Sequence, residues 1–564
     1  MKTNRREFLS SLGAAPAALY AVSSTLALSG KAEAVETPDG QVLFVGDDIA
    51  VADTTSGKVR GYILRDVYHF LGIPYGANTS GTNRFMPPEK PEPWTDIYPA
   101  LWWGNSAPQR MANRYANKYG AFRDAWNYDD VSENCLAINV FTPGYNDGKQ
   151  RPVLLWMHGG GWTNGNAIEH DGYNGENLAR FGDVVFCSLN HRLGPLGFSD
   201  FSAVGGEKYT ASGNVGARDL AAALQWVSDN IANFGGDPDN ITIMGQSGGG
   251  GKVCVTSSLP AAKGMVSKAV VLSGARLELR DKELKSKVGE YIVREAGLSP
   301  SQIDRLQAMP WQAYYELAMS AADKCLRESG IADVRAQDCF QPAVDSDFIP
   351  RFPYSPDASP NAADVPMMIC SVTEESSAAW RDPSARVTSL EDAAKIVAAS
   401  RDFPGISAQK AGEIVDAYAK AFPDRTAEEI LPMITTHRQR SVMLADAKSK
   451  QSPPVFLAWF GWQPPLFDER LRAFHTIDIC FWFHNTDRML SHTGGGARPR
   501  ALSEKMAASL VQFMNTGDPN GDGLMQWPRY TTAKGETLFL DDVPVVRNDP
   551  DRAARQTLPP HTGY

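Results

Sequence analysis

Cysteine is scarce in this chain, which has only seven among its 564 residues, an odd number. Disulfide-stabilised scaffolds need a far higher density of cysteine, so the fold has to depend on a hydrophobic core. Cys325 and Cys339 flank a polar stretch that suits a disulfide, and the sequence leaves both states of this pair open. Four others stand in apolar segments, where we expect buried free thiols: Cys187, Cys254, Cys370 and Cys480.

Motifs for metals and cofactors are also missing. There is no Cys/His spacing typical of zinc sites, no His-Glu-x-x-His and no haem-attachment motif. The stretch Asp518-x-Asn520-x-Asp522-Gly523 resembles the first half of a calcium loop, but Arg529 stands where the twelfth position needs a bidentate glutamate. We therefore expect neither a metal nor a cofactor.

The chain lacks basic runs as well, and its formal net charge is −10. An acidic chain without a Lys/Arg stripe interleaved with aromatic residues does not suit a nucleic-acid-binding face. What is present is ordinary globular composition, with 43% hydrophobic and 21% charged residues. The sequence can therefore bury a large core, and we expect no nucleic-acid partner.

The first 34 residues have the pattern of an export signal. A twin-arginine core, Asn4 to Leu9, precedes a moderately apolar stretch and the small-residue exit Ala32-Glu33-Ala34. Gly13 and Pro16 weaken the apolar stretch as an anchor, and no other run approaches membrane-spanning length. We predict that residues 1–34 are a cleaved signal peptide read by the Tat export machinery. The mature chain would be periplasmic, without stable membrane insertion.

Strand and helix patterns alternate through the middle of the chain. Leu220, Leu224 and Val227 fall at helical spacing between apolar runs. The apolar runs are typical of parallel strands that are buried on both faces: Arg151 to Met157, Val184 to Asn190, Ile241 to Met244, Lys268 to Leu272, Val365 to Val372 and Pro454 to Phe460. The predicted fold class is α/β, with a mostly parallel, doubly wound sheet. Two helical insertions are expected, at about 281–345 and 388–450.

The stretch from Ile241 to Gly251 carries the strongest chemical signal. A β-branched run ends in Gly-Gln-Ser-Gly-Gly and flows into a helical pattern, which is the strand–turn–helix arrangement of a nucleophile elbow. The tight turn strains the backbone at Ser247, and Gly245 and Gly249 relieve the crowding. The motif by itself is short and common, and glycine-rich turns also bind phosphates, so it leaves both interpretations open.

A second glycine run, His158 to Trp162, follows the predicted central strand that ends at Met157. Glycines leave consecutive backbone N–H groups unobstructed, and such donors can hold a developing oxyanion. A plain loop is the alternative for this run alone. Together with the elbow, the run favours an oxyanion hole.

These segments, in this order, resemble the type-B carboxylesterase and cholinesterase family of the α/β-hydrolase superfamily. The similarity extends from about Val51 to the C-terminus and includes further segments: Phe70 to Tyr75, Glu133 to Val140, Asn190 to Arg192, Trp226 to Pro238, and Thr516 to Asn520. The resemblance implies one α/β-hydrolase catalytic domain over residues 35–564, with the helical insertions walling a gorge above the elbow. It also implies a small-molecule ester substrate and no cofactor.

The resemblance assigns a Ser-Glu-His triad in the chain order of these hydrolases. Ser247 matches the nucleophile. His475 matches the base, because the residues around it reproduce the family's spacing, whereas the competing His484 stands where relatives carry glycine. Glu375 aligns best with the triad carboxylate, and Glu374, one residue earlier, stays open as the alternative.

The remaining site residues also come from the resemblance. The oxyanion hole is assigned to the backbone N–H groups of Gly160, Gly161 and Gly248. Three aromatic residues are candidate walls of the substrate pocket: Trp162, Phe481 and Trp482.

Two neighbours of the nucleophile depart from the family pattern. Relatives usually have Glu before the serine and Ala after it, whereas this chain has Gln246 and Gly248. Without a carboxylate there, the site loses a local attraction for cationic substrates. We therefore predict a serine carboxylesterase that cleaves neutral or bulky esters through an acyl-enzyme. The alternatives are a non-catalytic binding protein on the same fold and a lipase.

Overall fold

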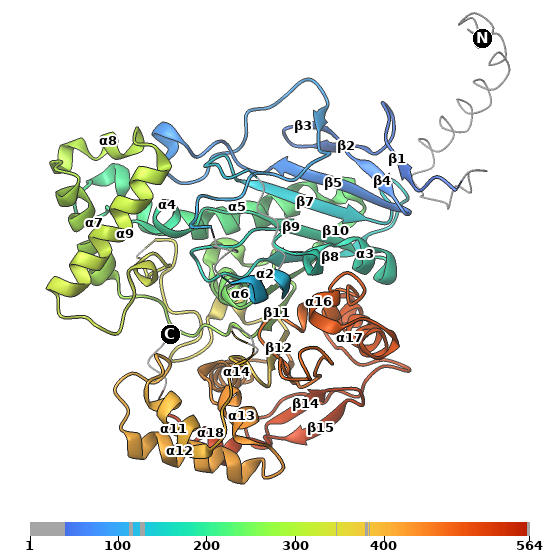
Figure 1. The fold of residues 1–564 in the computed structure, drawn as a ribbon. Helices are drawn as coiled ribbons and strands as arrows, with labels where there is room; N and C mark the ends of the chain where they lie inside the picture. The colour runs from blue at the N-terminus through green and yellow to red at the C-terminus, as the bar shows by residue number, and fades with distance from the viewer. Residues whose placement is uncertain are drawn as a thin grey trace, which may run out of the picture.

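The structure is a computed structural model that describes residues 40–560 except 112–116, 124–129, 346, 378, 380, 381 and 383. The predicted signal segment, residues 1–34, lies outside the described residues. One 12-stranded sheet runs through the molecule in the order β1-β4-β5-β7-β9-β8-β10-β11-β12-β13-β14-β15 (Figure 1). All neighbours from β9 to β14 pair in parallel, and the pairs at the two edges are antiparallel. This confirms the α/β prediction of a mostly parallel sheet.

The strands are short and mostly buried. In chain order the large sheet comprises β1 (Leu43–Phe44), β4 (Tyr62–Leu64), β5 (Val67–Pro74), β7 (Ala137–Thr142), β8 (Arg151–Met157), β9 (Val185–Leu189), β10 (Gly236–Gln246), β11 (Lys268–Leu272), β12 (Met367–Val372), β13 (Val455–Phe460), β14 (Glu536–Leu540) and β15 (Val545–Asn548). A small sheet of β2 (Val51–Thr54), β3 (Gly57–Arg60) and β6 (Tyr98–Pro99) lies near the N-terminal edge.

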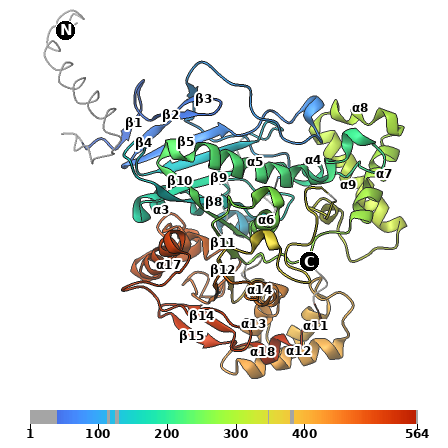
Figure 2. The ribbon, with the colours of Figure 1, turned by 180° about the vertical axis from the view of Figure 1, so that it is seen from behind.

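Helices cover both faces of the sheet (Figures 1 and 2). They are α2 (Lys118–Arg123), α3 (Glu176–Gly182), α4 (Gly194–Phe198), α5 (Val215–Asn230), α6 (Gly248–Ser258), α7 (Lys282–Glu295), α8 (Asp304–Gln307), α9 (Trp311–Glu328), α11 (Leu390–Ala398), α12 (Ala408–Ala421), α13 (Ala427–Ile430), α14 (Thr436–Lys448), α15 (Ile479–Trp482), α16 (Leu490–Thr493), α17 (Ala497–Thr516) and α18 (Arg552–Arg555).

Two hydrophobic cores explain why the central strands are apolar at every position. Val153 and Leu155 of β8 belong to the core that contains α5 and α6, whereas Leu154 and Trp156 belong to the core that contains α17. Successive side chains of a strand point to opposite faces, so a sheet that is covered on both sides needs apolar residues throughout.

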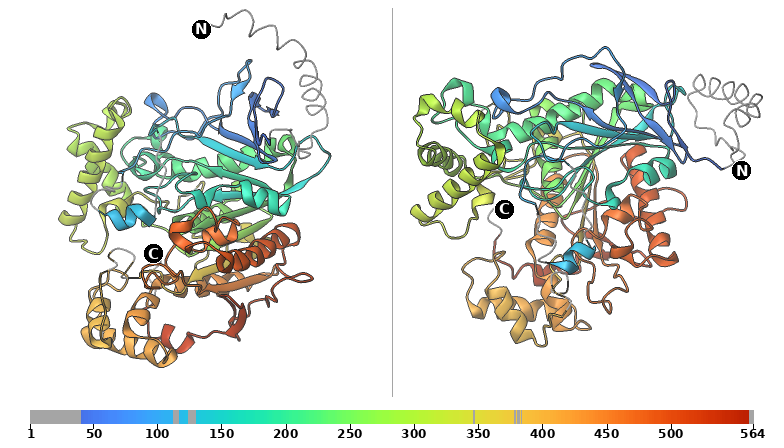
Figure 3. Two further views of the ribbon diagram at one scale, coloured as in Figure 1. Left: turned by 45° about the vertical axis from the view of Figure 1, so that its right-hand side comes forward. Right: turned by 45° about the horizontal axis from the view of Figure 1, so that its top comes forward.

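Two groups of helices lie beyond the sheet. The first group, α7 to α9, is yellow-green in Figure 1, and the second comprises α11 to α13, in orange, and α18, in red. Both views in Figure 3 show the two groups apart from one another, along the same side of the molecule. Cys325 lies in α9, and Cys339 lies in the short turn Ala336–Cys339 that follows it. Both are buried free thiols. Helices α7 to α9 and α11 to α13 lie within residues 281–345 and 388–450, where the sequence predicts insertions, whereas α18 lies outside both ranges.

Among the described residues, no helix combines the length and the apolar character that crossing a membrane requires.

A buried carboxylate connects α3 to the segment that follows α15. Glu176 accepts hydrogen bonds from Arg65 (Nε to Oε1, 2.6 Å), Arg180 (Nη2 to Oε1, 2.5 Å) and Arg488 (Nη2 to Oε2, 2.7 Å). Burial by itself would raise the pKa of Glu176, but the hydrogen bonds and the three positive charges outweigh burial and lower the pKa to about 2. Glu176 is therefore ionised in the folded protein.

We expect Glu176→Gln to lower the free energy of unfolding by about 3 kcal/mol near neutral pH, because the change removes one partner of a buried charge network. The folded pKa of about 2 lies below the unfolded value of 4.5, so the stabilisation is complete above pH 4.5 and is lost as the pH falls through 2. Thermal unfolding at pH 6 and pH 3 should show a smaller difference between the two proteins at pH 3. In the matched control, Glu316→Gln, an exposed ion pair with Arg110 is lost and no measurable change is expected.

Candidate active site

Neighbouring strands of the parallel sheet end at one edge, and the segments that follow them carry the predicted site residues. β8 leads into Gly160 and Gly161, β10 into Ser247, β12 into Glu375 and β13 into the segment with His475. β8 pairs directly with β10, and β12 pairs with β13. Residues that are far apart in the sequence are therefore brought to the edge where open α/β sheets bind their ligands.

Ser247 stands at a sharp turn between β10 and α6. Its backbone has φ 57° and ψ −123°, a strained conformation for a residue with a side chain. Its N–H donates to the carbonyl of Leu272 at 2.8 Å, and its own carbonyl accepts from Gly251 N–H at 3.2 Å. The strand–turn–helix pattern that the sequence predicts is present, with the serine at the turn.

The glycine loop after β8 packs directly on the turn. A Cβ atom added to Gly248 would lie 2.3 Å from both the nitrogen and the oxygen of Gly161. Gly160 and Gly161 themselves have φ of 78° and 65°, values that favour glycine. The departure from Ala at position 248 thus has a steric reason, because backbone meets backbone here.

His475 contacts the predicted carboxylate. Its Nδ1 lies 2.5 Å from Oε2 of Glu375. Since the ionised carboxylate only accepts, Nδ1 carries the proton and Nε2 is the acceptor of the ring. The side-chain nitrogen of Gln246 lies 3.1 Å from that Nε2. Within the described residues, Ser247 Oγ makes no hydrogen bond. The imidazole of His475 contacts Gln246, the residue before the serine, and not the serine oxygen.

The electrostatic surroundings keep Glu375 charged. Burial raises the pKa of this carboxyl, but electrostatic attraction to the neighbouring His437 and His475 side chains, together with the hydrogen bond from His475, outweighs burial and holds the pKa below its usual range. Only 2% of Glu375 is exposed. The imidazole of His475 therefore faces a buried negative charge.

Glu374 has a different set of partners. It forms a buried ion pair with Arg425, and its Oε2 accepts from the N–H of Ala473 at 3.1 Å. Its own N–H donates to the carbonyl of Ala473 at 3.2 Å. Glu374 thus holds the segment that leads into His475, while Glu375 contacts the imidazole.

His437 is a neighbour of the site that sequence reasoning missed. Its ring lies 5.3 Å from the ring of His475, and ligand atoms of Glu375, His437 and His475 lie within 4.8 Å of one another. Two imidazoles and a carboxylate are a ligand set that zinc accepts, but a metal would have to displace the Glu375–His475 hydrogen bond. No motif surrounds His437, and the only local signal is the start of a helix capped by Thr435.

A buried lysine supports the glycine loop from below. Lys252 of α6 donates from Nζ to the carbonyl of His158 at 2.8 Å and to that of Gly159 at 3.3 Å. Burial lowers its pKa to about 7. Lys252 is a second residue that sequence reasoning missed, because nothing in the sequence shows that a lysine after a glycine run is buried.

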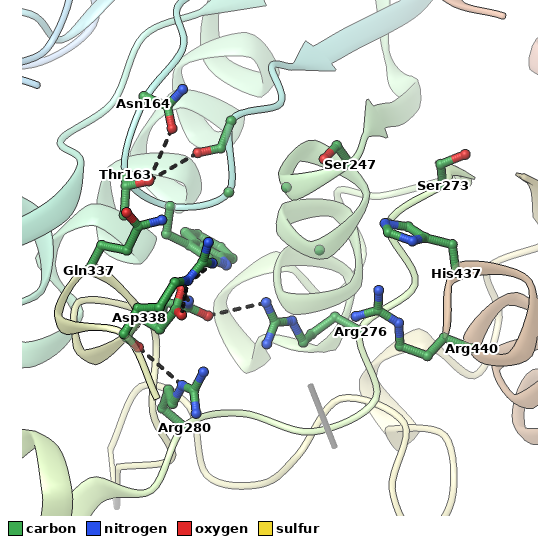
Figure 4. A pocket seen from close by; sticks show the side chains of 18 of the residues that line it. Thr163, Asn164, Ser247, Ser273, Arg276, Arg280, Gln337, Asp338, His437 and Arg440 are labelled. Carbon is green, nitrogen blue, oxygen red and sulfur yellow. Dashed lines mark hydrogen bonds and ion pairs between the residues drawn. The ribbon is translucent and has the colours of Figure 1, made fainter. Parts of the chain in front are cut away.

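The site opens into a cavity of about 540 Å³. Gly160, Gly161, Ser247 and Gly248 line it on one side, and Trp162 lines it as the sequence suggested. Figure 4 shows Ser247 at the start of α6, with Ser273, His437 and Arg440 also facing this space. The other walls come from the segments after β11 and after α9, from the connection between α11 and α12, and from α14.

Phe481 and Trp482 lie elsewhere, which corrects the expectation that they wall the pocket. Both are fully buried in the core that contains α17. Phe481 packs on Phe460 with ring centroids 5.0 Å apart, and Trp482 donates to Asp478. The family spacing places these two residues shortly after His475 in the chain, but the short helix α15 directs their side chains toward the core.

His484 is also outside the cavity that contains Ser247. Its ring packs on Phe181 with centroids 4.5 Å apart, and burial lowers its pKa. Among the two candidate histidines, the structure brings only His475 to Glu375.

Known proteins of similar sequence and structure share this fold. The model of the carboxylesterase family matches residues 48–557. The chain belongs to this family. It is a carboxylic ester hydrolase with the α/β-hydrolase fold.

Characterised carboxylesterases match along nearly their whole length. The chain is 33% identical to para-nitrobenzyl esterase of Bacillus subtilis (strain 168), over 91% of this chain and 99% of that protein. Among solved structures, an esterase from Clostridium hathewayi that can hydrolyse aliphatic aromatic polyesters has a TM-score of 0.77 at 30% identity, over 92% of this chain and 99% of that one. The Geobacillus stearothermophilus carboxylesterase has a TM-score of 0.74 at 29% identity, over 90% and 100% of the two chains.

We expect Gly248→Ala to reduce ester hydrolysis by about 10²-fold, because the added Cβ would displace the backbone of Gly161, whose N–H is predicted from the sequence to be an oxyanion donor, and loss of such a donor costs about that much. The matched control is Gly251→Ala on the same helix, where the nearest atoms to a new Cβ are 3.7 Å away. Turnover of p-nitrophenyl acetate measures both. Equal activity of the two variants would contradict the proposed role of the close contact.

Proposed function

We propose that this carboxylesterase uses a catalytic triad of Ser247, His475 and Glu375. The observation that carries the proposal is the 2.5 Å contact between Glu375 and His475 Nδ1, next to a strained serine at a strand–helix turn. The contact leaves Nε2 of the imidazole as a base beside the elbow. Gln246, which contacts Nε2 in the free enzyme, gives up this contact when Ser247 donates its proton.

In the acylation half, Ser247 Oγ attacks the ester carbonyl carbon while its proton passes to His475 Nε2. The negative charge develops on the former carbonyl oxygen, and the N–H groups of Gly160, Gly161 and Gly248 stabilise it. Glu375 stabilises the imidazolium. The tetrahedral intermediate then breaks its bond to the alcohol oxygen, which leaves with the proton from His475.

Deacylation repeats these steps with water. His475 removes a proton from the water as its oxygen attacks the acyl-serine carbonyl. Ser247 then leaves the second tetrahedral intermediate and recovers its proton from His475. The net reaction adds one water to the ester and gives a carboxylic acid and an alcohol, with no redox change and no cofactor consumed.

The substrate proposal starts from the residues beside the nucleophile. Gln246 supplies no negative charge there, so cationic esters gain no local attraction. We propose neutral or bulky esters as the class to compare first, and the cavity of about 540 Å³ accommodates a bulky one, since ligand pockets span about 300–1,000 Å³.

We expect Ser247→Ala to lower the hydrolysis of p-nitrophenyl acetate by at least about 10³-fold and to abolish labelling by a fluorophosphonate. Without Oγ no acyl-enzyme can form. A variant that hydrolysed the ester at the wild-type rate would overturn the triad.

Two adjacent carboxylates give the matched control. Glu375→Gln should lower kcat by about 10³–10⁴-fold with a small change in Tm, because it loses the charge that stabilises the imidazolium. Glu374→Gln should lower Tm more, because it breaks the buried pair with Arg425, and should lose less activity. The reverse pattern would make Glu374 the triad acid.

We also propose that the Tat machinery exports the protein to the periplasm, that residues 1–34 are removed and that residues 35–564 form one catalytic domain. The twin-arginine core Arg5-Arg6 supports this proposal.

Replacing both arginines of that core by lysine should leave the full-length precursor in the cytoplasm, because the export machinery recognises the arginine pair. Cell fractionation and N-terminal sequencing of the wild-type protein measure the outcome. Periplasmic activity from the doubly substituted precursor would contradict it.

A further inference from the structure

The cavity above Ser247 is basic, although the chain as a whole is acidic. Its lining includes five arginines and only three aspartates, in a chain of formal net charge −10. The arginines are Arg276, Arg280, Arg335, Arg401 and Arg440, and the aspartates are Asp333, Asp338 and Asp402. A pocket for a purely apolar ester needs no such lining, because ligand pockets are mostly apolar with a few placed polar groups.

Some of these charges have structural partners. Arg335 pairs with both carboxylate oxygens of Asp338 at 2.6 and 2.9 Å. Arg276 donates to the neutral side chain of Gln341, and Arg280 donates to the main-chain carbonyl of Asp338. These contacts hold the segment after α9 in place. Arg335 neutralises one of the three aspartates, Asp338.

Arg440 is different. It lies one turn after His437 on α14, is half-buried and, among the described residues, makes one hydrogen bond, from Nε to the carbonyl of Thr436 at 3.4 Å. Asp402 and Glu375 attract it, but neither forms an ion pair with it in the described part of the chain. Burial lowers the pKa of Arg440, because the loss of hydration outweighs that attraction.

The two terminal nitrogens of the Arg440 guanidinium make no hydrogen bond within the described residues, and Arg440 lines the cavity. In Figure 4, Arg440 and Arg276 extend in the same direction, toward the loop that carries Gln337 and Asp338. A planar guanidinium with two unengaged N–H edges is suited to bind a carboxylate through two parallel hydrogen bonds. A partly dehydrated cation that forms no ion pair within the described residues gains most from an anionic ligand.

We infer that the substrate of the Ser247 site is an ester that also carries a carboxylate, and that Arg440 binds this carboxylate. The inference rests on the proposed serine esterase function and replaces neutral esters with acidic esters as the substrate class. The uncharged residues beside Ser247 favour neutral esters, whereas the arginines further from Ser247 in the cavity favour an anionic group. The formal net charge of −10 repels anions at long range, so the preference arises inside the cavity.

The test compares acidic esters with neutral partners of the same shape. One pair carries the charge on the acyl side, mono-4-nitrophenyl suberate against 4-nitrophenyl octanoate. The other carries it on the alcohol side, 4-acetoxybenzoate against methyl 4-acetoxybenzoate. In at least one pair we expect kcat/KM of the wild-type enzyme to favour the acidic ester by tenfold or more, and added NaCl to reduce the ratio.

Substitution at the arginine makes the test specific. Arg440→Gln should reduce the acidic-to-neutral ratio by at least tenfold, mainly through KM, whereas Arg440→Lys should keep part of it because the charge remains. The control is Arg305→Gln, the same loss of charge at an exposed residue of α8 outside the cavity, and it should leave the ratio unchanged.

Each outcome decides one question. Wild-type enzyme that hydrolyses neutral esters as well as or better than both acidic ones overturns the inference and leaves the esterase proposal standing. A ratio that Arg440→Gln does not change overturns the role of Arg440. Failure to hydrolyse any of the four esters overturns the proposed function itself, and with it the inference. The wild-type comparison does not depend on the folding of any variant.

Discussion

Close packing of backbone on backbone around Ser247 is the constraint on which the rest of the site depends. A Cβ at Gly274 would lie 1.9 Å from the carbonyl oxygen of Ser247, and one at Gly248 would lie 2.3 Å from Gly161. No side chain fits at these contacts, so the segments after β8, β10 and β11 approach one another more closely than ordinary residues allow. This approach holds the serine in its strained conformation beside the N–H groups of the glycine loop.

Buried charged side chains hold the two loops beside this packed turn, the glycine loop after β8 and the segment that leads into His475. Glu374 binds the main chain of Ala473 while Arg425 neutralises it, and Lys252 binds the carbonyls of His158 and Gly159. Each charged group is satisfied by protein partners, as burial requires. Arg440 contrasts with these groups, because its charge is only partly compensated within the described residues. Glu374 and Lys252 therefore support the structure, whereas Arg440 faces the cavity above Ser247.

Local patterns were enough to predict the strands, the elbow and the glycine run, because burial on both faces and a tight turn each demand particular residues at neighbouring positions. The position of a residue in the chain does not show on which side of a helix its side chain lies. The family resemblance places Phe481 and Trp482 at the cavity for this reason, whereas α15 directs them into the core. His437 and Arg440 stand in an insertion without a motif, and only packing brings them to the site.

The sequence by itself determined the fold class and the serine at the turn, because these follow from residue types at short spacing. The order of the candidate triad is what the resemblance to the carboxylesterase family implies. Only the tertiary structure decided that Glu375 rather than Glu374 contacts His475, and that an acidic chain has a basic cavity above Ser247. The physical reason is that hydrogen bonds and charge interactions act over a few ångströms in space. Which distant residues come within that range depends on how the strands and insertions pack.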